Sequence, residues 1–165
     1  RDNRINMIYE GTNTVQSLDL LGRKVLGNQG ATLKKFGKLV GALVAEEGVN
    51  EKMAEFINPI AMLGEQMTKF TTEIGFKGMQ NPDEVGAAAV DYLRVAGHLV
   101  FGYMFARMAQ VALRAIAAGN ADPFYVAKLQ TARFYFAKLF PETVMLMRTA
   151  RAGSKVLMDT DAALA

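Results

Sequence analysis

The sequence contains no cysteine and only one histidine, His98, among its 165 residues. The absence of cysteine excludes disulfide bonds, thiolate metal sites and cysteine nucleophiles together. A lone histidine also excludes the histidine clusters that commonly hold zinc. These classes of site are thereby removed from consideration.

Long apolar runs are also missing. The longest stretch without Asp, Glu, Lys or Arg is the twelve residues 95–106. A membrane-spanning helix needs roughly 20 apolar residues, so we expect none, and no signal-peptide pattern opens the chain. With 51% hydrophobic and 21% charged residues, the composition is typical of one compact soluble domain. Because residue 1 is Arg rather than Met, we expect further coding sequence upstream.

Apolar residues recur with helical spacing along the whole chain, and no segment alternates like a strand. Cap residues mark helix starts at Asn13, with Gln16 as a variant capping box, at Asn50, at Asn81-Pro82 and at Asp122-Pro123. Helices are predicted over about 14–26, 32–47, 51–75, 82–118 and 123–151, the last kinked at Pro141. Short connections make neighbours antiparallel. The predicted fold is therefore all-α, an up-down-up-down helical bundle preceded by one further helix (14–26).

The helix predicted to end at 118 has a regular apolar stripe on one face. Its members are Leu93, Gly97, Val100, Met104, Met108, Val111 and Ala115. The ten methionines of the chain fall mostly on stripes of this kind. This pattern favours a methionine-rich core over a methionine-rich binding groove.

Charge is distributed unevenly around a net value of +3. Residues 94–155 carry nine basic side chains against the two acids Asp122 and Glu142. A basic half can bind anionic partners. No nucleic-acid motif or aromatic-basic platform accompanies it, so we interpret these residues as solvated outer faces of helices and expect no nucleic acid partner.

Residue patterns for self-contained catalysis are also absent. The only serines, Ser17 and Ser154, lack a glycine elbow, and no glycine-rich phosphate loop of a known type occurs. His98 lies in an apolar helical stretch and is interpreted as structural. Carboxylates near helix ends, Glu46 and Glu47 among them, are interpreted as solvated.

One short motif remains, at residues 8–13. Its sequence IYEGTN places Glu10 directly before a helix start and beside apolar and aromatic residues. A helix start offers free N–H groups and a positive dipole end that suit phosphate. An apolar setting raises the pKa of a carboxyl group toward that of a general base. Helix capping alone would explain the same pattern. From the residues by themselves, a functional site and a simple helix cap therefore both remain possible interpretations.

The longer segment 1–16 reads RDNRINMIYEGTNTVQ, and LDLLGRK follows at 18–24. It resembles the C-terminal motif of acyl-CoA dehydrogenases, RDxRIxxIYEGTNxIQ. The continuation, with its helical remainder, resembles a bacterial branch that includes 3-(methylthio)propanoyl-CoA and fatty acyl-CoA dehydrogenases. The resemblance covers about the first 24 residues.

This resemblance implies roles for five residues. Glu10 matches the catalytic base that removes the α-proton of the acyl thioester, while the β-hydrogen leaves as hydride to FAD. The backbone N–H of Glu10 would polarise the thioester carbonyl. Gly11 matches a substrate-binding position, and Thr12, Asn13 and Thr14 match positions that contact FAD. Thr14 stands where many members carry Gln.

The same resemblance implies an organisation and partners. Residues 1–30 would end the catalytic C-terminal domain, and 31–165 would form an extra C-terminal helical bundle. The chain is then a C-terminal fragment of a longer dehydrogenase, inactive and without FAD when alone. The full-length enzyme is expected to be a cytoplasmic bacterial homo-oligomer that uses an acyl-CoA substrate and passes electrons to an electron-transfer flavoprotein. No metal ligand is implied.

A second hypothesis treats the bundle as a non-catalytic interaction or oligomerisation module. Phe134, Tyr135 and Phe136 are adjacent, so at least one must face outward. The basic excess could meet an anionic surface, although membrane contact is the less favoured version. The two hypotheses are compatible, because they concern different parts of the chain.

Overall fold

The computed structural model describes residues 11–159, which form helices joined by short turns and contain no strand. The elements in chain order are α1 (Asn13–Leu18), η2 (Asp19–Leu26), α2 (Ala31–Glu47), η3 (Glu51–Met53), α3 (Ala54–Gln80), α4 (Asp83–Ala117), α5 (Pro123–Phe134), η4 (Tyr135–Leu139), α6 (Glu142–Ala150) and α7 (Lys155–Met158). The segments η2 and η4 are π-helical, and η3 is a 3-10 turn.

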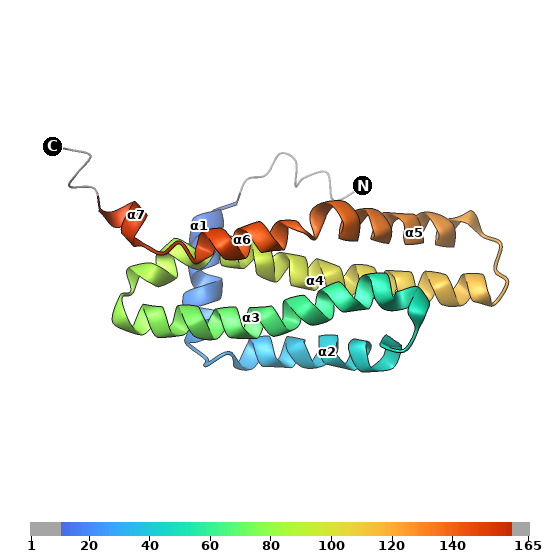
Figure 1. Cartoon of the computed structure of the whole chain (residues 1–165), viewed down its shortest axis with the longest axis horizontal. Coiled ribbons are helices and arrows are strands. Elements are labelled where there is room, and N and C mark those ends of the chain that lie inside the picture. The colour runs from blue at the N-terminus through green and yellow to red at the C-terminus, as the bar shows by residue number, and fades with distance from the viewer. Residues whose placement is uncertain (1–10, 160–165) are drawn as a thin grey trace.

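The long helices form an antiparallel bundle (Figure 1). Helix α3 packs against α2 and α4, and α4 also packs against α5 and α6. The continuous run α1–η2 crosses the other helices and packs on α4 (Figure 1). The predicted fold, an all-α bundle preceded by one further helix, is confirmed.

Helix boundaries follow the expected cap residues at three points. The side chain of Asn50 accepts a hydrogen bond from Lys52 N, that of Asn81 from Asp83 N, and that of Asp122 from Phe124 N. At the other end of α4, Gly119 has φ +79°, which suits glycine, and the chain turns there as predicted. The predicted end of the third helix at Gly75 was wrong, because α3 continues to Gln80.

The core joins all layers of the bundle around large side chains of α3 and α4. Phe56, Phe70 and Tyr92 are fully buried, and the rings of Phe70 and Tyr92 stack. The Tyr92 hydroxyl lies 2.8 Å from Thr71 Oγ1 inside this core. Burial raises the pKa of Tyr92 to about 12, so the hydroxyl stays neutral and hydrogen-bonded.

Helix α4 turns a different face to the core from the one with the predicted stripe. Its buried side consists of Ala88, Ala89, Tyr92, Val95, Leu99, Gly102, Ala106, Ala109 and Ala112, with Gln110. Of the predicted stripe, Val100, Met104 and Val111 are exposed. Because both sides of α4 are apolar, periodicity could not identify the side that faces the core. The side with the smaller residues is the buried one, because small side chains let neighbouring helices approach closely.

This two-sided apolar character has a further consequence. The expectation of no potential membrane span, drawn from charge-free runs, is corrected by α4, which is long and apolar enough to cross a membrane by length and composition. Long central helices of soluble bundles pass the same test. Here α4 packs against α3, α5 and α6.

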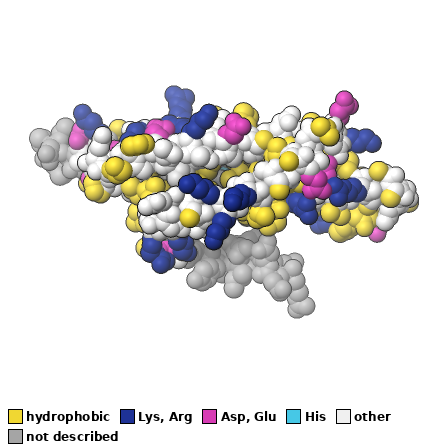
Figure 2. All heavy atoms as spheres, turned by 90° about the horizontal axis from the view of Figure 1, so that it is seen from below, with side chains coloured by type: hydrophobic (Ala, Val, Ile, Leu, Met, Phe, Trp, Pro, Cys, Tyr) yellow, Lys and Arg dark blue, Asp and Glu magenta, His cyan; other side chains and the backbone are white. Residues whose placement is uncertain are grey.

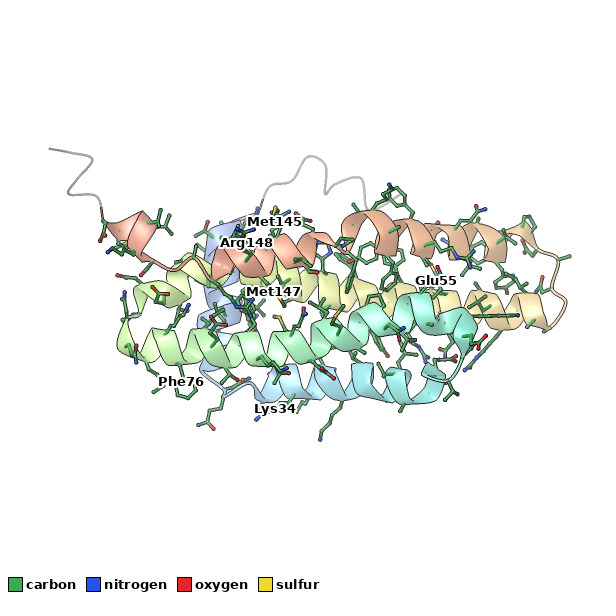
Figure 3. The ribbon with its side chains drawn as sticks, viewed as in Figure 1. Lys34, Glu55, Phe76, Met145, Met147 and Arg148 are labelled. Carbon is green, nitrogen blue, oxygen red and sulfur yellow. The ribbon has the colours of Figure 1, made fainter. Side chains whose placement is uncertain are left out.

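The methionines do not form the predicted core. Met53, Met67 and Met147 are buried, but Met62, Met79, Met104, Met145 and Met158 are exposed. Figure 3 shows the contrast within α6, where Met147 points into the bundle and Met145 points away from it. Smaller and branched residues fill most of the interior instead.

The last predicted helix is interrupted rather than kinked. Helix α5 is followed directly by the π-helical η4, which ends at the cap residue Phe140. The backbone N–H of Phe140 donates a hydrogen bond to Tyr135 O at 3.0 Å. A separate helix, α6, begins after Pro141. A proline ring clashes with the carbonyl four residues before it in an α-helix. The wider π turn between α5 and α6 relieves this clash.

Candidate functional site

The motif at the start of the chain is described only in part. The predicted catalytic residue Glu10 lies outside the described residues 11–159. Gly11, Thr12, Asn13 and Thr14 are all exposed and adjoin the start of α1. The structure thus brings the predicted substrate and cofactor positions together on one accessible turn.

The helix start differs in detail from the predicted capping box. Helix α1 begins at Asn13, and Thr12 is the cap residue, because Thr12 O accepts the first helical hydrogen bond from Gln16 N at 2.9 Å. The Thr12 side chain makes no cap hydrogen bond. The expectation that Asn13 caps the helix was therefore wrong, and within the described residues no side chain caps the first backbone N–H groups of α1.

A row of buried residues anchors this turn to the bundle. Ser17, Leu21 and Val25 are buried at four-residue intervals along α1–η2, and Ser17 Oγ donates to Thr14 O at 2.7 Å. Val15 and Leu18, on another side of α1, are exposed. The turn at 11–14 is thus held in place from one side and is open on the other.

His98 and the serines are engaged in structural contacts. The His98 ring lies between α4, η4 and α6, with Nδ1 2.9 Å from the Tyr135 hydroxyl and Nε2 3.1 Å from Glu142 Oε2. Burial, and then the charge of Glu142, raises the pKa of Tyr135. Ser154 donates from N and Oγ to Glu84, at 2.8 and 2.6 Å. These groups tie helices together and do not form a nucleophile–base pair.

Glu47 is buried, contrary to the expectation that it is solvated. Its side chain accepts hydrogen bonds from Gln110 and Arg114 of α4 and from Asn50, which is 2.7 Å away. Burial alone would raise the pKa of Glu47, but these three donors outweigh it and hold that pKa below its usual value. This carboxylate therefore joins α2 to α4.

Many of the basic side chains in 94–155 form ion pairs with glutamates of other helices. They are Arg94–Glu142, Arg107–Glu46, Arg114–Glu46, Arg114–Glu47, Arg133–Glu55 and Arg151–Glu73. On the face seen in Figure 2, basic side chains form small separate groups rather than one continuous patch. The charge excess therefore serves mainly to join arginines of α4–α6 to acids of other helices.

Sequence reasoning missed a groove between α2 and α3 with a volume of about 740 Å³. Leu33, Val40, Val44 and Met67 supply apolar walls, and the exposed Lys34, Lys38 and Glu65 lie among its lining residues. Gly37, Gly41 and Gly64 also line it. These glycines were the available signal, since missing side chains at a helix interface leave space.

Comparison with known proteins adds the family. The family model described as "Acetyl-CoA dehydrogenase C-terminal like" matches residues 31–161. The chain belongs to this family. The match begins at the first residue of α2 and so covers the bundle from α2 to α7, without α1 and η2.

Curated relatives of this family member are acyl-CoA dehydrogenases, which confirms the family that the sequence resembles. The 3-methylmercaptopropionyl-CoA dehydrogenase of Ruegeria pomeroyi is 32% identical over 86% of this chain and 24% of the relative. A butyryl-CoA dehydrogenase of Syntrophomonas wolfei is 25% identical over 96% and 27%. The broad-specificity linear acyl-CoA dehydrogenase of Mycobacterium tuberculosis is 24% identical over 86% and 24%. The chain spans about a quarter of the length of these relatives.

Proposed function

We propose that this chain is the C-terminal part of an FAD-dependent acyl-CoA dehydrogenase in which Glu10 removes the α-proton of an acyl-CoA thioester. Residues 1–30 would end the catalytic domain, and 31–165 would form the added bundle. The observation that carries the proposal is the motif at 1–16, joined directly to a bundle of the acetyl-CoA dehydrogenase C-terminal-like family.

The described part of the motif is compatible with FAD. Gly11, Thr12, Asn13 and Thr14 are exposed, contain no charged group and lie at the start of α1, where the Thr12 side chain makes no cap hydrogen bond. Hydroxyls, an amide and helix N–H groups are suitable donors for the polar and phosphate oxygens of such a cofactor. When bound, FAD supplies the acceptor for the hydride that leaves the β-carbon.

The chain's own residues would have two tasks. Glu10 would take the α-proton onto its carboxylate, and its backbone N–H would donate to the thioester oxygen as negative charge develops there. Gly11 would allow close approach of the substrate, since it has no side chain. The anchored row Ser17, Leu21 and Val25 would hold this turn at a constant position relative to the bundle.

The test replaces Glu10 in the longer dehydrogenase polypeptide. Glu10→Gln should lower acyl-CoA turnover by roughly 10²–10⁴-fold, the usual contribution of a general base, with little change in fold. The matched control is Asp19→Asn, since Asp19 is an acid paired with Arg23 and Lys24 in η2. Unaltered turnover in Glu10→Gln would refute the role of Glu10.

The isolated 165-residue chain gives a second test. We expect it to purify colourless and inactive, because the remaining parts of a flavin site are supplied elsewhere in the longer enzyme. Flavin absorbance together with dye-coupled turnover of an acyl-CoA by this chain alone would contradict that expectation. An electron-transfer flavoprotein as acceptor, a homo-oligomeric full-length enzyme and a cytoplasmic location belong to the same proposal.

The interaction-module hypothesis is favoured by a specific observation and concerns a different part of the chain. Phe134 is exposed while its neighbour Tyr135 is buried, as expected for one outward aromatic. The exposed apolar residues of α4, such as Phe101 and Met104, also favour this hypothesis. A bundle with such surfaces is suited to contact other protein, in addition to any role of the motif.

A further inference from the structure

The groove between α2 and α3 has apolar walls that reach into the bundle. Side chains of η2, α2, α3 and α4 supply these walls, namely Leu26, Leu33, Val40, Val44, Met67 and Leu99. Among them Val40, Met67 and Leu99 are buried. The volume of about 740 Å³ lies within the range of small-molecule sites, roughly 300–1,000 Å³. The groove therefore suits an apolar ligand of that size.

Glycines of α2 keep this space open. Gly37 and Gly41 both line the groove and lie one helical turn apart. A Cβ atom on either glycine would meet nothing within 4 Å. Glycine is unfavourable inside a helix, and these two do not bring α2 closer to a neighbour in return. The open space is thus built into α2 by its own residues.

The hydroxyl groups along the groove already have acceptors within α3. Thr68 Oγ1 donates to Gly64 O at 3.2 Å, and Thr72 Oγ1 donates to Thr68 O at 3.0 Å. Thr71 Oγ1 donates to Met67 O at 2.7 Å. A ligand with polar groups along its length would leave them without partners here, which is unfavourable, whereas a hydrocarbon chain needs no such partners.

Two lysines of α2 determine the charge that the ligand should carry. Lys34 and Lys38 line the groove, are exposed and form no ion pair within residues 11–159. Lys34 lies near the start of α2, where the helix dipole also favours a negative charge. The lining also includes the acid Glu65 of α3, so the anionic group belongs on the α2 side. One anionic head group could contact both ammonium groups there.

The same charges disfavour a second copy of the chain as the occupant. Identical chains usually pair about a two-fold axis, so that one surface meets itself. Lys34, Lys35 and Lys38 of one copy would then approach the same three lysines of the other, against the single acid Glu65 in the lining. Such like-charge contacts are costly. A small ligand with an anionic head meets no such repulsion.

We propose that this groove binds a single-chain amphiphile, with its hydrocarbon chain between α2 and α3 and its anionic head group at Lys34 and Lys38. A fatty-acid carboxylate and a monoalkyl phosphate share this chemistry. The groove begins at the far end of the run α1–η2 from the turn at 11–14, on the other side of the bundle (Figure 1). It is therefore separate from that turn, and the proposal does not rest on the proposed function.

The first test is a calorimetric titration of the 165-residue chain with dodecanoate and with dodecyl phosphate, both below their micelle concentrations. We expect saturable binding of one molecule per chain for at least one anion, and the tighter of the two identifies the head group. Dodecyltrimethylammonium has the same chain length with a cationic head, and it should bind at least about tenfold more weakly. Equal affinity for the cation and the anions, or no saturable binding, would overturn the proposal.

The head-group position is tested by removing the lysines. The double variant Lys34→Gln, Lys38→Gln should bind the tighter anion at least about tenfold more weakly than the parent. Lys35→Gln is the matched control, because Lys35 is exposed on the same helix but does not line the groove. Glu65→Gln should bind the anion as tightly as the parent or more tightly. Equal weakening by the double variant and by Lys35→Gln would contradict the assigned head-group position.

The chain position is tested by filling the groove. Gly41→Leu adds a side chain to a lining residue, and it should abolish binding while circular dichroism shows unchanged helix content. Gly37→Leu takes its place if that variant fails to fold. Gly86→Leu is the control, since Gly86 of α4 is equally open but does not line the groove. Binding that survives in both groove variants would place the ligand elsewhere and refute the proposal.

Two further measurements distinguish a ligand from a protein occupant. The affinity for the anion should not depend on the concentration of the 165-residue chain, whereas weaker binding at higher concentration would assign the groove to a second copy. The comparison of parent and Gly41→Leu is then repeated in the longer dehydrogenase polypeptide. The same loss of binding is expected there. No difference between the two would mean that other protein covers the groove, and the proposal would fail.

Discussion

The ring of His98 lies with Nε2 3.1 Å from the carboxylate of Glu142, so the only histidine of the chain joins α4 to α6. Its other nitrogen, Nδ1, lies 2.9 Å from the hydroxyl of Tyr135 in the π turn η4. Arg94 pairs with the same glutamate. This cluster connects three elements at the point where Pro141 interrupts the last long helix.

Removing the Tyr135 hydroxyl should weaken this connection. Tyr135→Phe keeps the ring, which stacks on Phe105, but leaves His98 without one partner. We expect the free energy of unfolding in urea to fall by about 1–2 kcal/mol. Tyr103→Phe is the control, because the Tyr103 hydroxyl forms no hydrogen bond within the described part of the chain, and its loss should cost less. Equal losses in the two variants would contradict a stabilising role for the cluster.

The buried carboxylate of Glu47 should make stability depend on pH in the acid range. Its pKa in the folded state is below the ordinary value of 4.5, so folding favours the ionised form. That contribution is fully present above pH 4.5 and is lost as the pH falls through the lowered pKa. We therefore expect the free energy of unfolding to decrease as the pH is lowered below about 4.5.

The residue-specific part of this dependence is measured with Glu47→Gln. Denaturant titrations at a series of pH values should show a shallower loss of stability on acidification than in the parent chain. Glu51→Gln is the control, since Glu51 is exposed and forms no ion pair among the residues that the structure describes. A pH dependence as steep in Glu47→Gln as in the parent would show that other carboxylates account for it.

Glycine has opposite consequences at two positions of the bundle. A Cβ atom on Gly102 would lie 2.7 Å from Phe140 and 3.0 Å from Ile60, so α4 needs a glycine where it meets α3 and the end of η4. Gly102→Ala should lower the free energy of unfolding by about 1–3 kcal/mol through overpacking. Gly41→Ala is the control in an open position of α2, where a Cβ atom meets nothing within 4 Å. There alanine should stabilise the helix by about 0.5–1 kcal/mol. Changes of the same sign in both variants would refute the argument.

Local signals in the sequence were sufficient for the order of the long helices, but not for the break between α5 and α6. Asn81 and Asp122 cap the helices that they were expected to cap, because capping depends on residues two positions away. The core side of α4 was not predictable in this way, since apolar residues occupy both of its sides. The burial of Glu47 depends on Gln110 and Arg114, more than sixty residues away. Such distant partners leave no periodic mark on the sequence.

In the candidate site, too, local sequence identified some features, while others depend on how distant residues meet. The resemblance of segment 1–16 identified Gly11–Thr14, and the structure shows these residues together at the exposed start of α1. The predicted roles of these residues and of Glu10 remain predictions. The groove between α2 and α3 arises from how two glycine-containing helices meet, which spacing within either helix does not specify.

The end of the chain should be released by a single substitution at Glu84. Its carboxylate accepts hydrogen bonds from Ser154 N and Oγ, which hold the turn at Gly153 (φ +82°) against the start of α4. These two donors lower the pKa of Glu84. Glu84→Ala should therefore raise amide hydrogen exchange at 154–158 by about tenfold or more while global stability changes little. Asp83→Ala is the control, because Asp83 also lies in the first turn of α4 and shares its favourable interaction with the helix dipole. Equal exchange at 154–158 in the two variants would show that Glu84 acts through that dipole alone and not by holding Ser154.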